Sequence, residues 1–305
     1  MSNLQECKTK SQKCKIASAF ANFSELVMLG HTIFSASFIL IAMCVASIEV
    51  NASVWAGWRV FFLCVIALIS ARNFAMGFNR LCDKDIDSRN DRTKRRPSVD
   101  GRISVRAMII FCVVNAAIFI ITGYFINTLA FALSVPFLVI LGGYSLMKRV
   151  SSLAHIVLGI SLGLAPIAGV IAIEGAITLW CVLLALGVVF WVAGFDILYS
   201  LQDLQVDKRE GLFSVPSRFG VIGALRISRV FHVLAVGFWC AFAYVADIGA
   251  AGWVGIALSA GMLIYEQYLV HRDFANIPRA FFTTNGYLGF VLLACIVIDG
   301  LMRTI

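Results

Sequence analysis

Nine apolar stretches run through the chain, and each is long enough to cross a lipid bilayer as a helix. A spanning helix needs about 20 mainly apolar residues. Of the 305 residues, 60% are hydrophobic and only 14% are charged, whereas soluble domains average roughly 45–50% apolar and 25% charged. We therefore predict an all-α membrane protein with nine transmembrane helices. The predicted spans are 28–48, 53–78, 105–126, 128–147, 153–174, 177–201, 221–246, 250–271 and 282–302.

The basic residues predict how these helices are oriented. If the N-terminus lies inside the cell, 22 of the 25 Lys and Arg residues flank the membrane on the cytoplasmic side, as the positive-inside rule requires. We therefore expect a multi-pass protein of the cell (inner) membrane with its C-terminus external. Residues 1–27 would form a cytoplasmic tail, and residues 28–305 a single transmembrane domain. This topology also accounts for the net charge of +8, so the lipid bilayer is the expected partner and no nucleic acid is.

One polar segment interrupts the apolar pattern, at residues 79–97 (NRLCDKDIDSRNDRTKRRP). Asn79, Asp83 and Asp87 recur every four residues, so on a helix they share one face, and Arg72 lies on the same face. Carboxylates stacked in this way repel one another unless a cation neutralises them. Oxygen ligands without His or Cys favour Mg²⁺. A solvated loop is the alternative, but it leaves the intramembrane Arg72 unexplained.

A second acidic segment follows the predicted span 177–201. Asp196, Asp203 and Asp207 are spaced seven and four residues apart, which places them on one helix face near Tyr199. In the predicted topology both acidic segments end on the cytoplasmic side, so they can face each other across one cavity. Two carboxylate clusters with nearby basic residues would bind Mg²⁺ and a diphosphate. The apolar helices beyond would hold a hydrocarbon tail, a combination that suits ionisation of an allylic diphosphate.

Both segments resemble signatures of the UbiA superfamily of intramembrane prenyltransferases. The first segment, Asn79-x3-Asp83-x3-Asp87 followed by Arg92-Thr93-x2-Arg96-Pro97, is similar to the first signature of this superfamily. The second segment, Asp196-x2-Tyr199-x2-Gln202-Asp203-x3-Asp207, is similar to the second signature. The resemblance implies a helical bundle around a central cavity. It also implies Mg²⁺-dependent transfer of a polyprenyl group from polyprenyl diphosphate to an aromatic acceptor.

The resemblance implies roles for individual residues as well. One Mg²⁺–diphosphate unit is expected on Asn79, Asp83 and Asp87, and the other on Asp203 and Asp207. Asp196 is expected to orient the acceptor or assist its deprotonation, which adds it to the four metal-binding aspartates as a catalytic candidate. The substrate-binding candidates are Arg72, Asn79, Tyr144, Lys148, Tyr199 and Lys208.

The acceptor and two rival functions stay open at this point. The two segments most resemble a bacterial quinone-pathway branch, whose acceptor is 4-hydroxybenzoate or the dihydroxynaphthoate of menaquinone synthesis. Arg80 stands where many superfamily members carry an Asp, which leaves the choice between these acceptors open. A haem-farnesylating enzyme of the same superfamily and a membrane transporter are the alternatives. His31 falls in the first predicted span, near the expected acceptor pocket, whereas His155 and His232 have no partner nearby in sequence.

Overall fold

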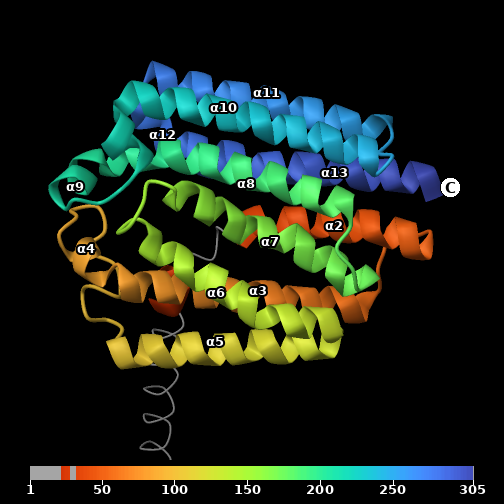
Figure 1. The fold of residues 1–305 in the computed structure, drawn as a ribbon, viewed down its shortest axis with the longest axis horizontal. Coiled ribbons are helices and arrows are strands. Elements are labelled where there is room, and N and C mark those ends of the chain that lie inside the picture. Colours follow the sequence, from red (N-terminus) through yellow and green to blue (C-terminus); the bar gives the residue numbers. More distant parts are fainter. Residues whose placement is uncertain (1–21, 28–31, 305) are drawn as a thin grey trace, which may run out of the picture.

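The long helices of the protein run side by side in one bundle (Figure 1). This computed structural model describes residues 22–27 and 32–304. His31 and most of the predicted cytoplasmic tail therefore lie outside the described residues. Within the described ranges every regular element is a helix or a helical turn, which confirms the predicted all-α class.

Nine helices of the described ranges are long and apolar. Eight of them have the length and composition to cross a membrane, and α2 adds a shorter apolar stretch, Ala36–Asn51. The protein is therefore a multi-pass membrane protein. The long helices are α2 (Thr32–Asn51), α3 (Trp58–Cys82), α5 (Val105–Ile126), α6 (Thr128–Met147), α7 (Ala154–Glu174), α8 (Leu179–Ser200), α10 (Val215–Val245), α11 (Ala250–Arg272) and α13 (Asn285–Thr304). The short elements are α4 (Lys84–Ser88), a 3₁₀ turn (Leu201–Asp203), α9 (Leu204–Arg209), a second 3₁₀ turn (Phe274–Asn276), α12 (Ile277–Arg279) and a π-helical turn (Ala280–Thr284).

The hairpin between α5 and α6 turns at a single residue, Asn127. Its side-chain oxygen accepts a hydrogen bond from the backbone N–H of Ala130 at 2.8 Å, which caps α6. Its side-chain amide donates to the carbonyl of Ile171 in α7 at 2.6 Å. One asparagine thus starts one helix and ties the hairpin to a third, as expected for a membrane protein whose backbone groups need internal partners.

The main departure from the predicted boundaries is at the start of α10. The helix begins at Val215, six residues before the predicted start, because Ser214 and Ser217 form a capping box there. Gly220 follows with φ 70°, a left-handed conformation that kinks the helix. The polar first turn of α10 therefore lies near the second acidic segment.

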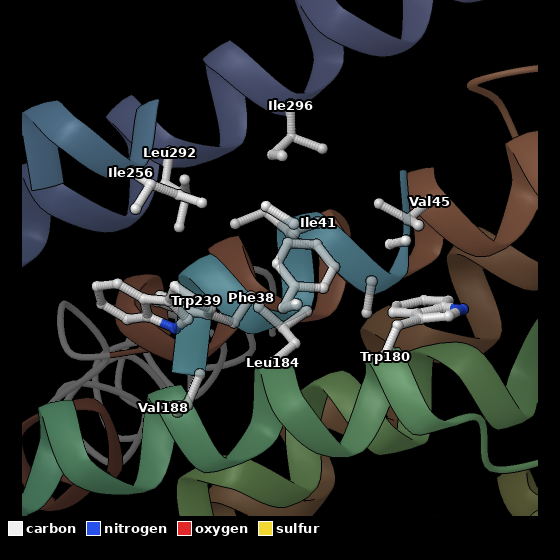
Figure 2. Packing of buried hydrophobic residues seen from close by; sticks show 14 of the residues in the cluster. Phe38, Ile41, Val45, Trp180, Leu184, Val188, Trp239, Ile256, Leu292 and Ile296 are labelled. Carbon is white, nitrogen blue, oxygen red and sulfur yellow. The ribbon is translucent and has the colours of Figure 1, made fainter. Parts of the chain in front are cut away.

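The core of the bundle is built around α8, which packs against α7 and α10. Trp239 of α10 stacks on Phe38 of α2 with ring centroids 5.7 Å apart, and both rings are fully buried beside Leu184 and Val188 of α8 (Figure 2). Gly187 lets the indole of Trp239 lie directly on the α8 backbone, where a Cβ would collide with it. This packing fixes α8, the helix that carries the second acidic segment.

Both acidic segments lie at one end of the bundle. The short helices α4 and α9 lie side by side there, at the left of Figure 1, while the C-terminus lies at the opposite end. Arg209 of α9 also donates a hydrogen bond to the carbonyl of Arg89, at 2.7 Å. Segments that are more than a hundred residues apart in sequence therefore share one polar end of the protein.

Candidate active site

A cavity of about 260 Å³ opens between the two acidic segments. Its walls come from α3, α6, α7 and α8 and from the segments around α4 and α9. Lys208 is exposed and is not among the lining residues, so the structure does not bring it to the cavity. The other ten candidates all line it: Arg72, Asn79, Asp83, Asp87, Tyr144, Lys148, Asp196, Tyr199, Asp203 and Asp207.

The first acidic segment is a helix broken at its second member. Helix α3 ends at Cys82, and Asp83 adopts φ −94° and ψ 6° between α3 and α4. The backbone N–H of Asp83 still donates to the carbonyl of Asn79, and that of Asp87 to the carbonyl of Asp83. The side-chain amide of Asn79 also donates to Asp83 at 2.8 Å. The predicted four-residue spacing is thus preserved, although the helix is not continuous.

The second acidic segment repeats this break. Asp203 adopts φ −98° and ψ 2° at the junction between the 3₁₀ turn and α9, within a few degrees of the values at Asp83. Asp207 follows one turn later on α9, as Asp87 does on α4. The sequence predicted two uninterrupted helix faces, whereas in the structure each segment is interrupted at an aspartate and continues as a short helix. In each segment the short helix carries the last aspartate, which lines the cavity.

Basic side chains of residues 92–96 hold two of these aspartates. Arg92 donates to both oxygens of Asp203, at 3.1 and 2.6 Å. Arg96 donates to both oxygens of Asp87, at 2.8 and 2.7 Å. Asn90 adds a hydrogen bond to Asp203 at 3.1 Å. The sequence analysis named none of these three residues as a site candidate. Arg92 and Arg96 belong to the first signature, and that membership was the signal that could have identified them.

Other charged groups of the cavity have perturbed pKa values or lack partners. Burial, together with the charge of Asp87, raises the pKa of Asp83 to about 6. Burial alone would lower the pKa of Lys148, but the surrounding carboxylates, Asp207 foremost, raise it. Oδ2 of Asp207 is buried and has no hydrogen-bond partner in the described chain. A buried carboxylate oxygen without a partner is costly, so this position calls for a cation.

The carboxylates do not form a closed metal cage. Within residues 22–27 and 32–304, no three His, Cys, Asp or Glu side chains are grouped closely enough to enclose an ion. Mg²⁺ is usually bound by one or two carboxylates, with waters and substrate phosphates completing its octahedron. The oxygen-only donor set and the unpaired oxygen of Asp207 therefore fit Mg²⁺ that binds together with a diphosphate.

A second, apolar cavity of about 120 Å³ adjoins the first. It is lined by α3, α5, α6 and α7, with Leu68, Phe119 and Ala168 among its walls. Arg72 and Tyr144 line both cavities. The Nε atom of Arg72 is buried without a hydrogen-bond partner in the described chain. The boundary between the polar and apolar spaces therefore holds a guanidinium group with one nitrogen that has no partner in the described chain.

His155 reaches the site through Asp196. The imidazole Nδ1 lies 2.7 Å from Oδ2 of Asp196 on α8, and Nε2 accepts a hydrogen bond from the backbone N–H of Val215 at 3.2 Å. The sequence offered no signal for this contact, because His155 and Asp196 are 41 residues apart on different helices.

A helical membrane protein with a charged cavity next to an apolar one has the arrangement of an intramembrane enzyme for amphipathic substrates. Residues 36–293 match the UbiA prenyltransferase family. The chain belongs to this family, and it is a prenyltransferase, which confirms the resemblance seen in the two signatures.

Relatives and solved structures agree with this membership. The chain is 31% identical to 4-hydroxybenzoate octaprenyltransferase of Providencia stuartii over 70% of this chain and 74% of the relative. It is 28% identical to the enzyme of that name from Yersinia pseudotuberculosis, over 81% of this chain and 88% of the relative. A UbiA homolog from Aeropyrum pernix K1 superposes with a TM-score of 0.79 at 31% identity, covering 88% of this chain and 98% of the homolog. A UbiA homolog from Archaeoglobus fulgidus bound to DMAPP and Mg²⁺ shares the fold, with a TM-score of 0.70 at 19% identity. The match covers 93% of this chain and 99% of the homolog.

Proposed function

We propose that this enzyme transfers a polyprenyl group from polyprenyl diphosphate to an aromatic acid in quinone biosynthesis, with Mg²⁺ as cofactor. The relatives named above are 4-hydroxybenzoate octaprenyltransferases, which makes 4-hydroxybenzoate the first acceptor to test. Dihydroxynaphthoate is the second. The membrane anchors the enzyme where its lipid-soluble donor and product reside.

The charge balance of the cavity carries this proposal. Five acidic and five basic side chains line the cavity, so the site is close to neutral as it stands. A diphosphate brings several negative charges, which the site alone does not compensate. Divalent cations that bind with the diphosphate supply the missing positive charge. The acidic residues are Asp83, Asp87, Asp196, Asp203 and Asp207, and the basic residues are Arg72, Arg80, Arg92, Arg96 and Lys148.

The chain's own residues have complementary roles in this reaction. Asn79, Asp83 and Asp87 would hold one Mg²⁺, and Asp203 and Asp207 the other. When bound, Mg²⁺ neutralises the leaving diphosphate and so favours cleavage of the allylic carbon–oxygen bond.

Lys148 lines the cavity among the carboxylates, Asp207 foremost, and its charged ammonium would contact the diphosphate directly. The apolar cavity would take the first part of the prenyl chain. Tyr199 and Phe281, whose ring centroids lie 4.3 Å apart, would face the electron-poor allylic carbon.

The aromatic acceptor would bind between Arg72 and Asp196. A carboxylate on the acceptor suits Arg72, because its buried Nε has no other partner in the described chain. A hydroxyl on the acceptor suits Asp196, because one of its carboxylate oxygens is not used by His155. We further propose that the cavity end faces the cytoplasm and the C-terminus faces outward, because this orientation satisfies the positive-inside rule.

A product assay tests the proposal. Membranes or purified enzyme would be incubated with Mg²⁺, a polyprenyl diphosphate and either 4-hydroxybenzoate or dihydroxynaphthoate, and the lipid extract analysed by mass. We expect a prenylated aromatic acid that requires both Mg²⁺ and the donor and disappears with EDTA. A farnesylated haem as the sole product would reassign the enzyme within its family. Substrate accumulation in vesicles without a covalent product would indicate transport and overturn the proposal.

A further inference from the structure

We infer that His155 is a positioning residue, which holds Asp196 in one orientation so that its second carboxylate oxygen receives the hydroxyl of the aromatic acceptor. This inference rests on the proposed function and deepens it.

Three helices meet at this pair. His155 lies in the first turn of α7, Asp196 lies on α8, and Val215 is the first residue of α10. The side chain of His155 is 1% exposed, whereas that of Asp196 is 18% exposed and lines the cavity. The histidine is therefore sealed behind the aspartate and acts on ligands only through it.

The hydrogen bonds fix which ring nitrogen carries the proton. The backbone N–H of Val215 can only donate, so Nε2 of His155 must accept and carries no proton. The proton of the neutral imidazole is then on Nδ1, which donates to Oδ2 of Asp196 at 2.7 Å. A doubly protonated imidazole would set two N–H groups against each other at Val215.

The donating Nδ1–H occupies one oxygen of Asp196 and leaves the other oxygen for a ligand. Oδ2 is occupied by His155, and Oδ1 makes no hydrogen bond to the part of the chain that the structure describes. Because the histidine is held between two helices, the carboxylate cannot turn without losing this bond. The hydrogen-bonded pair thus presents one carboxylate oxygen of fixed direction to the cavity.

The free carboxylate oxygen of Asp196 assists the reaction without becoming permanently protonated. It accepts a hydrogen bond from the acceptor hydroxyl, which increases the electron density of the aromatic ring. The allylic carbon–oxygen bond breaks with its electron pair passing to the diphosphate, and a ring carbon supplies the pair for the new carbon–carbon bond. That carbon then loses its proton to the released diphosphate, and the C–H electron pair restores the aromatic ring.

A purely structural role is the competing explanation, since polar side chains also join helices within membranes. The two explanations differ in how mutations combine. If His155 acts through Asp196, its loss has no further effect once Asp196 has been changed. If it only joins helices, the two losses multiply.

The test compares His155→Phe, His155→Gln, Asp196→Asn and the double variant His155→Phe/Asp196→Asn, with kcat and KM measured for both substrates. We expect His155→Phe to lower kcat about 100-fold while the KM for prenyl diphosphate changes little. His155→Gln keeps one donor and one acceptor and should lose less. The double variant should be no slower than Asp196→Asn alone.

Binding of Mg²⁺ with prenyl diphosphate, followed as a rise in melting temperature, shows that each variant is folded. A normal kcat in His155→Phe, or losses that multiply in the double variant, would overturn the inference while product formation by the wild-type enzyme leaves the proposed function standing. Absence of any prenylated product from the wild-type enzyme is the separate result that removes the proposed function.

Discussion

The guanidinium of Arg92 lies 2.6 Å from Asp203 and joins the two acidic segments across 111 residues of sequence. It also donates to the hydroxyl of Tyr199 at 3.0 Å. The same side chain thus contacts the expected metal ligand of one segment while its backbone belongs to the other. An ion pair of this kind keeps the two segments in register before cations and diphosphate arrive.

Replacing Arg92 by Lys should therefore weaken donor binding. Lysine keeps the charge but loses the forked geometry that contacts both carboxylate oxygens. We expect the KM for prenyl diphosphate to rise about tenfold, in line with the loss of one charge-assisted hydrogen bond. Steady-state kinetics with varied donor would measure this. Lys94→Ala is the control, because Lys94 pairs with the exposed Asp91 alone among the described residues. An equal effect there would point to surface charge instead.

Asp83→Asn and Asp203→Asn should each abolish most of the Mg²⁺-dependent transfer. Both carboxylates line the cavity, and loss of a charge that stabilises the reacting diphosphate costs about 100-fold or more. Turnover at saturating Mg²⁺ measures the effect. Asp85→Asn should stay near wild-type rates, because Asp85 is exposed and pairs with Arg149 on the surface. Full activity in either cavity variant would reject that ligand assignment.

The ligand-free enzyme should lose stability as the pH rises through the range set by Asp83. The pKa of this carboxyl is raised from 3.8 to about 6 by burial and by Asp87, so the folded state binds more protons than the unfolded state between these values. The contribution of Asp83 is complete below about pH 4 and is lost as the pH passes about 6. Melting temperatures in detergent would show this decline, and Asp83→Asn should flatten it.

Mg²⁺ with diphosphate should raise the melting temperature more at pH 7.5 than at pH 5, since the ligand carboxylate must be ionised to bind the metal. A shift of equal size at both pH values would show that Asp83 does not take part in binding.

Ala168→Phe should shorten the range of usable donors. Ala168 lines the apolar cavity, and an aromatic ring there would occupy much of its 120 Å³. We expect transfer from a long polyprenyl diphosphate to fall at least tenfold relative to transfer from geranyl diphosphate, measured by competition in one reaction. Val139→Phe on the outer face of α6, where the side chain is 68% exposed, should leave the ratio unchanged. A similar change in both variants would argue against this cavity as the prenyl site.

The sequence alone determined the fold class and most of the cavity-lining candidates. Long apolar stretches can only be satisfied in lipid as helices, and this physics predicted α5 and α6 to the residue. The four-residue spacing of Asp83 and Asp87 survives the break between α3 and α4, because the backbone hydrogen bonds across the break keep a helical rise. Local periodicity is sufficient wherever neighbours along one helix make the site.

Only the tertiary structure decided which groups meet across helices. The pairing of Arg92 with Asp203, and of His155 with Asp196, depends on how α7, α8 and the α4 and α9 segments pack. Lys208 was a substrate-binding candidate from the sequence, yet its side chain lies exposed outside the cavity. A periodic pattern gives the direction of a side chain about its own helix axis, whereas the distance to a partner on another helix is set by packing, which no single segment encodes.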